Sequence, residues 1–301
     1  MADLRALPKL RDSMSYIYIE HAVIEKKDNG LLVMQETGST QVPVANICVI
    51  LLGPGTSITH AAVRAAAENG CSLLWVGEDG GGYYGQGVGE TRRAHHLIRQ
   101  SELVNDPEKR LQVVLRMYEK RFEKPLPAGL SLEQVRGMEG ARVRTAYQQA
   151  SREYQVEWRG RQYDRSDWFR GDAINRALSA ANAVLNGICH AAIVSGGYSP
   201  GLGFLHTGRM LSFVYDIADL YKTRFTIPIA FKTISEGKAE IEKRTRQACR
   251  ERFREEKLLE HILPDIDDML GITQKEGFDY LEDDNSPEIW WDPVMAERRT
   301  P

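Results

Sequence analysis

Residues 172–197 place the strongest constraint on the fold, because they read as one long helix of small and apolar side chains. Alanine and serine recur around this helix, from Ala173 to Ser195. Side chains of this size let neighbouring helices approach closely on nearly every side, and a helix that is apolar all round is buried. We therefore predict that this helix lies at the centre of a helical domain.

The N-terminal part of the chain predicts β-strands. Residues 14–54 contain short apolar runs separated by polar turn residues. The triplet 28–30, Asp-Asn-Gly, favours a tight hairpin turn with positive φ. A further apolar strand is predicted over residues 71–78. We assign residues 1–90 to a mostly β N-terminal domain that contains one helix.

That helix is predicted over residues 60–69, where Thr56 or Ser57 can cap its first turn. The glycine-rich residues 80–87 are interpreted as a loose connector or a mobile hairpin tip. A glycine cluster after a strand also suggests a phosphate-binding loop, but no GxxxxGK[ST] motif follows. Nucleotide binding is therefore not predicted.

From residue 91 the pattern becomes helical. Asp106 and Pro107 are suited to the N-cap and first position of one helix, and Ser131 with Gln134 resembles a capping box for the next. We predict an α+β fold in which a β-sandwich-like N-terminal domain is followed by a larger all-helical domain over residues 91–264.

The net charge of −3 is unevenly distributed. Residues 251–301 carry 15 acidic and 6 basic side chains, a balance of −9, which leaves +6 on residues 1–250. A basic helix over 238–259 is predicted to close the fold, and residues 265–301 are predicted to be an acidic flexible tail. Basic bodies commonly bind polyanions.

The cysteines are isolated, and no CxxC pair exists among them: Cys48, Cys71, Cys189 and Cys249. Neither a disulfide framework nor a zinc site is therefore expected, and a reducing cytoplasm is the predicted location. No apolar run is expected to span a membrane, and the N-terminus lacks the apolar core of a signal peptide.

Residues 203–222 carry the first candidate site. His206 lies in a short glycine-flanked turn, and Asp216 and Asp219 follow one turn apart on an almost wholly apolar helix. Carboxylates on a buried helix are costly unless a cation meets them. An imidazole with hard oxygen ligands suggests Mg²⁺ or Mn²⁺. The alternative is that the two aspartates form a solvated stripe and His206 is an ordinary loop residue.

Glu139 is the second candidate. It lies between Gly137 and Gly140, and two interior glycines cost a helix about 2 kcal/mol relative to alanine. Such glycines let a substrate or another backbone approach the carboxylate. The alternative is a loop between two helices.

Residues 154–170 alternate aromatic rings with arginines, a pattern suited to unpaired bases and phosphates. The alternative is a linker whose aromatic rings pack on helices. The basic helix adds further cations, of which Arg246 and Arg250 are four residues apart and share a face.

Four segments together carry a resemblance: PGTSITHAAVRAAAENGCSLLWVGE, RGMEGARVR, WRGRQYDRSDW and GFLHTGRMLSFVYDIADLYK. They resemble the CRISPR adaptation integrase family, most closely the branch from type I-E systems, in colinear order from about residue 14 to about residue 260. The acidic tail falls outside the resemblance.

The resemblance implies an N-terminal β-sandwich domain, which serves dimerisation and DNA-end contacts, and a helical domain with one divalent-metal site. The implied ligands of Mg²⁺ or Mn²⁺ are Glu139, His206 and Asp219, with Asp216 as a supporting acidic residue. It further implies a homodimer, two of which are bridged by a small companion adaptation protein. That assembly would hold a duplex with single-stranded 3′ ends and insert it beside the leader of a CRISPR array.

The DNA contacts are predicted from the resemblance and the charge pattern. His21 stands where relatives carry a Tyr that stacks at the duplex fork; Tyr18 or Tyr16 would replace it only in a different register. Tyr163 and Trp168 are expected to hold the unpaired 3′ strand. The candidates for phosphate contacts are Arg64, Arg161, Arg209, Lys222, Lys243, Arg246 and Arg250.

We therefore predict a metal-dependent integrase and nuclease that joins a 3′ hydroxyl to a phosphodiester and nicks branched DNA. Exchange of one phosphodiester for another needs no nucleotide energy source, which agrees with the missing phosphate-binding loop. The alternatives are a non-catalytic DNA-binding scaffold of an adaptation complex and a stand-alone branched-DNA repair nuclease.

Overall fold

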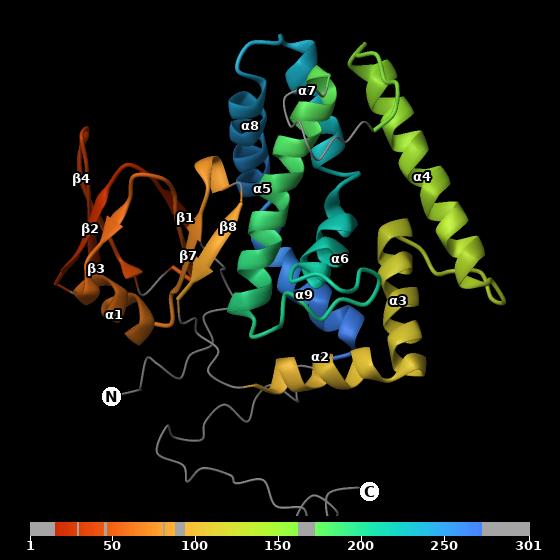
Figure 1. Ribbon diagram of the computed structural model, residues 1–301, viewed down its shortest axis with the longest axis horizontal. Coiled ribbons are helices and arrows are strands. Elements are labelled where there is room, and N and C mark those ends of the chain that lie inside the picture. Colours follow the sequence, from red (N-terminus) through yellow and green to blue (C-terminus); the bar gives the residue numbers. More distant parts are fainter. Residues whose placement is uncertain are drawn as a thin grey trace, which may run out of the picture.

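The protein consists of a strand-rich N-terminal domain followed by a larger helical domain (Figure 1). This computed structural model describes residues 16–28, 30–44, 47–80, 82–87, 94–161 and 172–272. The predicted α+β architecture, with a β-sandwich-like domain before a helical one, is confirmed. The expected domain boundary near residue 90 lies outside the described residues.

One sheet of the N-terminal domain has the order β1-β5-β7-β8. Strands β1 (Tyr16–Ile19), β5 (Val49–Leu52) and β7 (Ser72–Val76) are parallel, and β8 (Tyr83–Gln86) pairs antiparallel with β7. The glycine-rich segment was predicted as a loose connector or a mobile hairpin tip, and the connector interpretation is corrected by the antiparallel strand β8. Its backbone pairs with the buried β7, and this tertiary pairing outweighs the weak strand propensity of glycine.

The second sheet has the order β4-β3-β2-β6, with strands β2 (Val23–Lys27), β3 (Gly30–Gln35), β4 (Gly38–Val42) and β6 (Ser57–Ile58). The predicted hairpin joins β2 and β3, and Asp28 has a φ of 50° in its turn. Helix α1 (His60–Glu68) begins at the predicted residue, but its capping residue differs from the prediction. Its N-cap is Thr59, whose hydroxyl accepts from the N–H of Ala62, rather than Thr56 or Ser57.

The first sheet lies between two hydrophobic cores. Along β5, Ile50 and Leu52 pack with the second sheet and α1, whereas Val49 and Leu51 pack with the helical domain. Successive side chains of a strand point to opposite faces, so both faces of β5 are buried. This explains why its sequence is an unbroken apolar run.

The helical domain follows the local capping signals. Asp106 caps α3 ahead of Pro107, and Ser131 and Gln134 form the predicted capping box of α4. The described helices are α2 (His95–Asn105), α3 (Pro107–Phe122), α4 (Leu132–Glu153), α5 (Ala173–Ser195), α6 (Ser212–Tyr221), α7 (Thr226–Ser235), α8 (Ile241–Glu255) and α9 (Leu258–Leu270), with the short 3-10 helix η3 (Glu78–Gly80) after β7.

Helix α5 is the predicted central helix, surrounded by α6, α7, α8 and α9 (Figure 1). It is long and apolar enough to cross a membrane by length and composition, contrary to the expectation from the sequence. Most of it is buried inside the protein, as in the core helix of a folded domain. Its apolar surface is therefore accounted for by packing.

The C-terminal boundary also differs from the prediction. The basic segment forms α8, but a further helix, α9, continues through Pro264 to Leu270. Ile266, Met269 and Leu270 of α9 are buried in the core. Residues 265–270 therefore belong to the helical domain, and the remainder of the predicted tail, 273–301, lies outside the described residues.

Candidate metal and nucleic-acid site

Asp216 organises the turn that carries His206. Its carboxylate is fully buried on α6. One oxygen, Oδ2, accepts from the N–H groups of Phe204 at 2.6 Å and Leu205 at 3.0 Å, and Oδ1 accepts from the N–H of His206 at 2.9 Å. Three backbone donors thus satisfy the hydrogen-bonding oxygens of this buried carboxylate. The alternative of a solvated aspartate stripe is wrong for Asp216.

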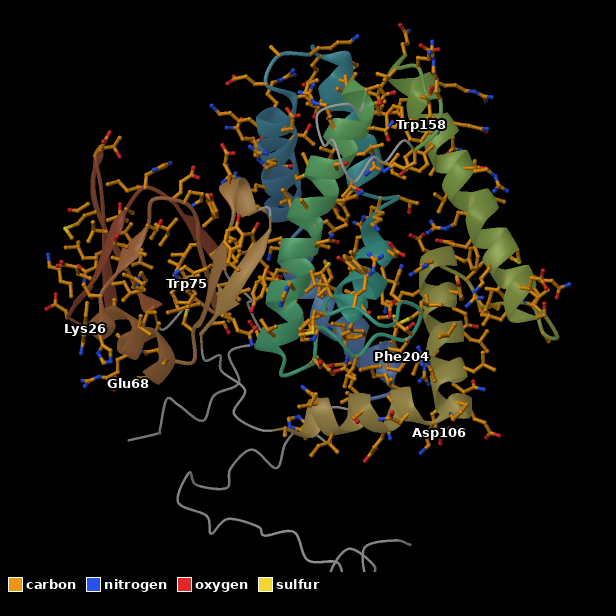
Figure 2. All side chains as sticks on the ribbon, in the orientation of Figure 1. Lys26, Glu68, Trp75, Asp106, Trp158 and Phe204 are labelled. Atoms are coloured by element: carbon orange, nitrogen blue, oxygen red, sulfur yellow. The ribbon has the colours of Figure 1, made fainter. Side chains whose placement is uncertain are left out.

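Arg110 of α3 holds the same turn from the other side. Its Nε donates to the carbonyl of Phe204 at 3.0 Å, and an Nη donates to the same oxygen at 2.7 Å. Phe204 itself is buried among the helices (Figure 2). The turn before His206 is thus fixed through its N–H groups by Asp216 and through its carbonyls by Arg110.

His206 is held in one orientation by this arrangement. Its Nδ1 lies 2.7 Å from Oδ1 of Asp216, while the side chain remains 46% exposed. A carboxylate on Nδ1 fixes the tautomer in which Nε2 is the free ligand atom, as in many metal-binding histidines. The Tyr215 ring lies edge-on to the imidazole at 5.8 Å.

The hydrogen bond with Asp216 raises the pKa of His206 above the usual 6.5 and outweighs the opposing effect of partial burial. Because the folded-state pKa is the higher one, this pair stabilises the fold fully below about pH 6.5 and loses that contribution as the pH rises through the folded value. We expect His206→Gln to destabilise the protein more at about pH 5.5 than at about pH 9, as measured by urea unfolding. A loss that is equal at both pH values would contradict this assignment.

Glu139 lies on α4, which runs without a break through Gly137 and Gly140. The alternative of a loop between two helices is therefore wrong. A side chain added at Gly137 would meet nothing within 4 Å, so this side of the helix is open. Arg142 holds the Glu139 carboxylate, with its Nε 3.0 Å from Oε2.

Asp219 lies one turn after Asp216 and is bound by two cations. Its Oδ1 is 2.5 Å from Nζ of Lys222, and its Oδ2 is 3.4 Å from an Nη of Arg121. Burial by itself raises the pKa of Asp219, but the charges of Lys222 and Arg121 outweigh burial and hold that pKa below its usual 3.8. The carboxylate is therefore ionised at neutral pH.

The donor chemistry of Glu139, His206 and Asp219 fits a divalent cation, with one imidazole and two ionisable carboxylates. Glu139 and Asp219 are linked through Arg121, since another Nη of that guanidinium lies 3.8 Å from Oε1 of Glu139. Among the described residues, however, no three His, Cys, Asp or Glu side chains lie close enough to share one ion. The assignment of these ligands stays a prediction.

Several predicted DNA contacts have partners within the protein. The Arg161 guanidinium bonds Asn175 and Ser179 of α5. On α8, Arg246 forms an ion pair with Glu78 at 3.0 Å, and Arg250 lies over the Tyr18 ring at 4.8 Å. The shared face of Arg246 and Arg250 thus contacts the N-terminal domain, a role that sequence reasoning did not foresee.

Other candidates remain accessible. Arg209 is exposed on the turn that carries His206, and Lys222 lies beside Asp219. Arg64 and Lys243 are exposed and form weak surface ion pairs with Glu68 and Glu240. Their contacts with phosphate stay predictions.

His21 is exposed between β1 and β2 with a φ of 49°. Tyr18 donates to a carboxylate oxygen of Glu20 at 2.6 Å, and Tyr16 is partly buried.

Tyr163 and Trp168 lie outside the described residues. The nearby Trp158, labelled in Figure 2, lies beside α4. Its ring stacks on that of Tyr147, so for this ring the alternative of packing on helices is confirmed.

Sequence reasoning missed Arg110 and Arg121, both on α3. A signal for Arg121 existed, because it continues the buried stripe of Val114, Met117 and Tyr118 at helical spacing. A charged residue in such a stripe predicts a buried counter-charge.

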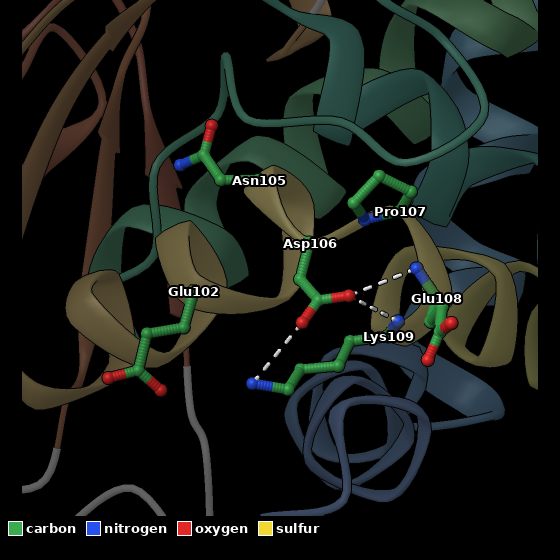
Figure 3. Close-up of a pocket in the computed structure, with 6 residues that line it drawn as sticks. All are labelled: Glu102, Asn105, Asp106, Pro107, Glu108 and Lys109. Atoms are coloured by element: carbon green, nitrogen blue, oxygen red, sulfur yellow. Dashed lines mark hydrogen bonds and ion pairs between the residues drawn. The ribbon is translucent and has the colours of Figure 1, made fainter. Parts of the chain in front are cut away.

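A depression lies elsewhere, at the junction of α2 and α3 (Figure 3). Asp106 is central to it, and its carboxylate accepts from the N–H groups of Glu108 and Lys109. These are helix-capping bonds, so Asp106 has a structural explanation. The depression is open and contains none of the predicted site residues.

A sequence model of the family described as CRISPR associated protein Cas1 matches residues 15–125 and 120–258. The chain is 51% identical over 293 residues to CRISPR-associated endonuclease Cas1 2 of Thermus thermophilus, covering 96% of this chain and 90% of the relative. It is 44% identical over 266 residues to CRISPR-associated endonuclease Cas1 of Escherichia coli, covering 88% and 87%.

Solved structures agree with these matches. The structure described as the TtCas1-DNA complex superposes with a TM-score of 0.76 at 53% identity, covering 88% of this chain and 99% of that one. A casposase bound to integration product has a TM-score of 0.58 at 14% identity, covering 95% and 98%, a likeness of fold alone.

Proposed function

The chain belongs to the Cas1 family of CRISPR-associated endonucleases, and from that premise we propose that it is a strand-transfer integrase as well as a nuclease. In this proposal it joins the 3′ hydroxyl of a short DNA fragment to a phosphodiester of a CRISPR repeat beside the leader. It also nicks branched DNA when water replaces that hydroxyl. The type I-E branch and a cytoplasmic location are part of the same proposal.

One observation carries the proposal: two acidic side chains from α4 and α6 face one guanidinium, beside a histidine fixed by a buried carboxylate. Glu139, His206 and Asp219 would hold Mg²⁺ or Mn²⁺. Such a cation supplies Lewis-acid stabilisation of the scissile phosphate and lowers the pKa of an attacking hydroxyl.

The protein's own residues would prepare this site. Asp216 and Arg110 fix the turn so that His206 keeps one orientation without substrate. Lys222 and the exposed Arg209 would place positive charge beside the reacting phosphate. Preorganised groups of this kind lower a barrier because they need not reorganise during the reaction.

The proposed nucleic-acid partner is a duplex with single-stranded 3′ ends. The 53% identity to a protein solved as a Cas1–DNA complex supports DNA binding. A homodimer, and a small companion protein that bridges two dimers, complete the proposal. The basic body of the chain is suited to a polyanion.

The test is a joining assay with the purified full-length protein, a short duplex with 3′ overhangs and a supercoiled plasmid that carries the repeat. We expect joined product with Mg²⁺ or Mn²⁺ and the companion protein, and none with EDTA. Duplex binding without joining would indicate a scaffold. Cleavage of branched DNA without the companion, and no joining with it, would indicate a repair nuclease. Either result would overturn the integrase proposal.

A further inference from the structure

Arg121 is the most deeply buried cation at the site. It lies in the last turn of α3, and its side chain is only 5% exposed. Its guanidinium lies between Glu139 of α4 and Asp219 of α6. A buried charge is costly without a partner, and these two carboxylates are the counter-charges. Arg121 therefore links α3, which also carries Arg110, to α4 and α6, which carry the two candidate carboxylates.

The contacts of Arg121 are long for a buried ion pair. The nearest nitrogen–oxygen distances are 3.8 Å to Glu139 and 3.4 Å to Asp219, whereas charge-assisted hydrogen bonds are typically about 2.7–2.9 Å. A third bond, to the backbone carbonyl of Asp216, is also 3.4 Å. Its Nε is buried and has no hydrogen-bond partner among the described residues. The guanidinium also lies 5.4 Å from the centroid of the Tyr118 ring, so it is enclosed although all its polar contacts are long.

The other oxygens of the two carboxylates are held more firmly from outside. Oε2 of Glu139 accepts from Nε of Arg142 at 3.0 Å, and Oδ1 of Asp219 accepts from Nζ of Lys222 at 2.5 Å. Each carboxylate therefore has an outer oxygen in a close bond and an inner oxygen, Oε1 or Oδ2, whose contacts are all 3.4 Å or longer: Oδ2 of Asp219 faces Arg121, and Oε1 of Glu139 lies 3.8 Å from Arg121 and 3.4 Å from an Nη of Arg142. The inner oxygens are the ones available to another cation.

We propose that Arg121 is a positioning residue that holds the inner oxygens of Glu139 and Asp219 near each other and yields them to a divalent cation. This inference rests on the metal site of the proposed function. The guanidinium and the metal ion compete for the same two oxygens. By linkage, whatever Arg121 contributes to the stability of the metal-free protein is reduced when the cation is bound.

The test compares the full-length protein with Arg121→Met, which keeps the approximate length of the side chain and removes its charge. Without metal, we expect a lower midpoint of thermal unfolding, because two carboxylates then lose their shared counter-charge. With Mn²⁺, we expect most of that loss to be recovered. Mn²⁺ affinity, measured from the EPR signal of free Mn²⁺, should increase about tenfold or more, because a competing positive charge is gone.

Two further variants separate positioning from a general structural role. Lys120→Met removes a charge from the adjacent position, where the ammonium binds Asp265 and Asp268 instead. It should lower the unfolding midpoint equally with and without Mn²⁺ and leave Mn²⁺ affinity unchanged. Arg121→Lys, which keeps the charge in case Arg121→Met does not fold, should restore the wild-type Mn²⁺ affinity to within about threefold.

The inference is overturned if the midpoint of thermal unfolding of Arg121→Met falls by the same amount with and without Mn²⁺ and its Mn²⁺ affinity is unchanged. That result would leave the metal site intact. Failure of the proposed function gives a different result. In that case the wild-type protein would not bind Mn²⁺, or Glu139→Ala would bind it as tightly as the wild type, and both proposals would fall together.

Discussion

Replacement of Glu139 or Asp219 by alanine is expected to abolish strand joining while leaving duplex binding largely intact. Each change removes a carboxylate proposed to hold the cation, and loss of Lewis-acid stabilisation worth about 4 kcal/mol lowers a rate about a thousandfold. Binding should survive because the loss of an acidic side chain makes the surface more positive toward phosphate. Joined product and duplex affinity are measured on the same preparations.

Glu133→Ala is the matched control for Glu139→Ala. Glu133 lies in the first turn of the same helix and is exposed. Its replacement should leave joining within about twofold, as expected for a surface substitution away from the site. If joining survived both Glu139→Ala and Asp219→Ala, the assignment of the metal ligands would be wrong.

Asp216→Ala is expected to have the second-largest effect, on stability as well as on joining. The change leaves the buried N–H of Phe204 and the partly buried N–H groups of Leu205 and His206 without this acceptor, and an unsatisfied buried donor costs about 1–3 kcal/mol. A loss of about 3 kcal/mol or more in the free energy of unfolding should follow. His206 also loses the bond that fixes its ring, so joining should fall even at temperatures where the variant is folded.

Asp216→Asn is expected to have a smaller effect on stability than Asp216→Ala. The amide keeps the size of the side chain and one accepting oxygen, so about half of the stability loss is expected, as measured by urea unfolding. Asp268→Asn serves as the control, because Asp268 is 74% exposed and pairs only with Lys120 among the described residues. It should cost less than about 1 kcal/mol. An Asp216→Ala variant as stable as Asp268→Asn would contradict the role of the buried carboxylate.

The elements that could be predicted were those with local causes. The cap at Asp106, the capping box at Ser131 and the β2–β3 turn depend on residues within a few positions of one another. The central position of α5 followed from its composition along the whole helix. In the two caps and the turn, the neighbouring sequence itself contains both partners of the stabilising interaction.

The elements that were wrong depend on pairing or packing with parts of the protein outside the element itself. Strand β8 forms from glycine-rich sequence because β7 provides its hydrogen bonds. Helix α9 continues through Pro264, at a cost of about 3 kcal/mol for an interior proline, because Ile266, Met269 and Leu270 bury apolar surface beyond it. Asp265 of that helix also binds Lys120 of α3. Lys120 lies far from α9 in the sequence, so the sequence around α9 does not reveal this ion pair.

The sequence by itself determined which groups are available: two carboxylates on an apolar helix, a histidine in a glycine-flanked turn and a glutamate between glycines. Only the tertiary structure decided which side chains and backbone groups lie next to these candidate site residues. It buried Asp216 against the turn of His206 and placed Arg121 between Glu139 and Asp219. The physical reason is that side-chain types and helical spacing are local properties, whereas charge partners inside a core are set by how separate helices pack.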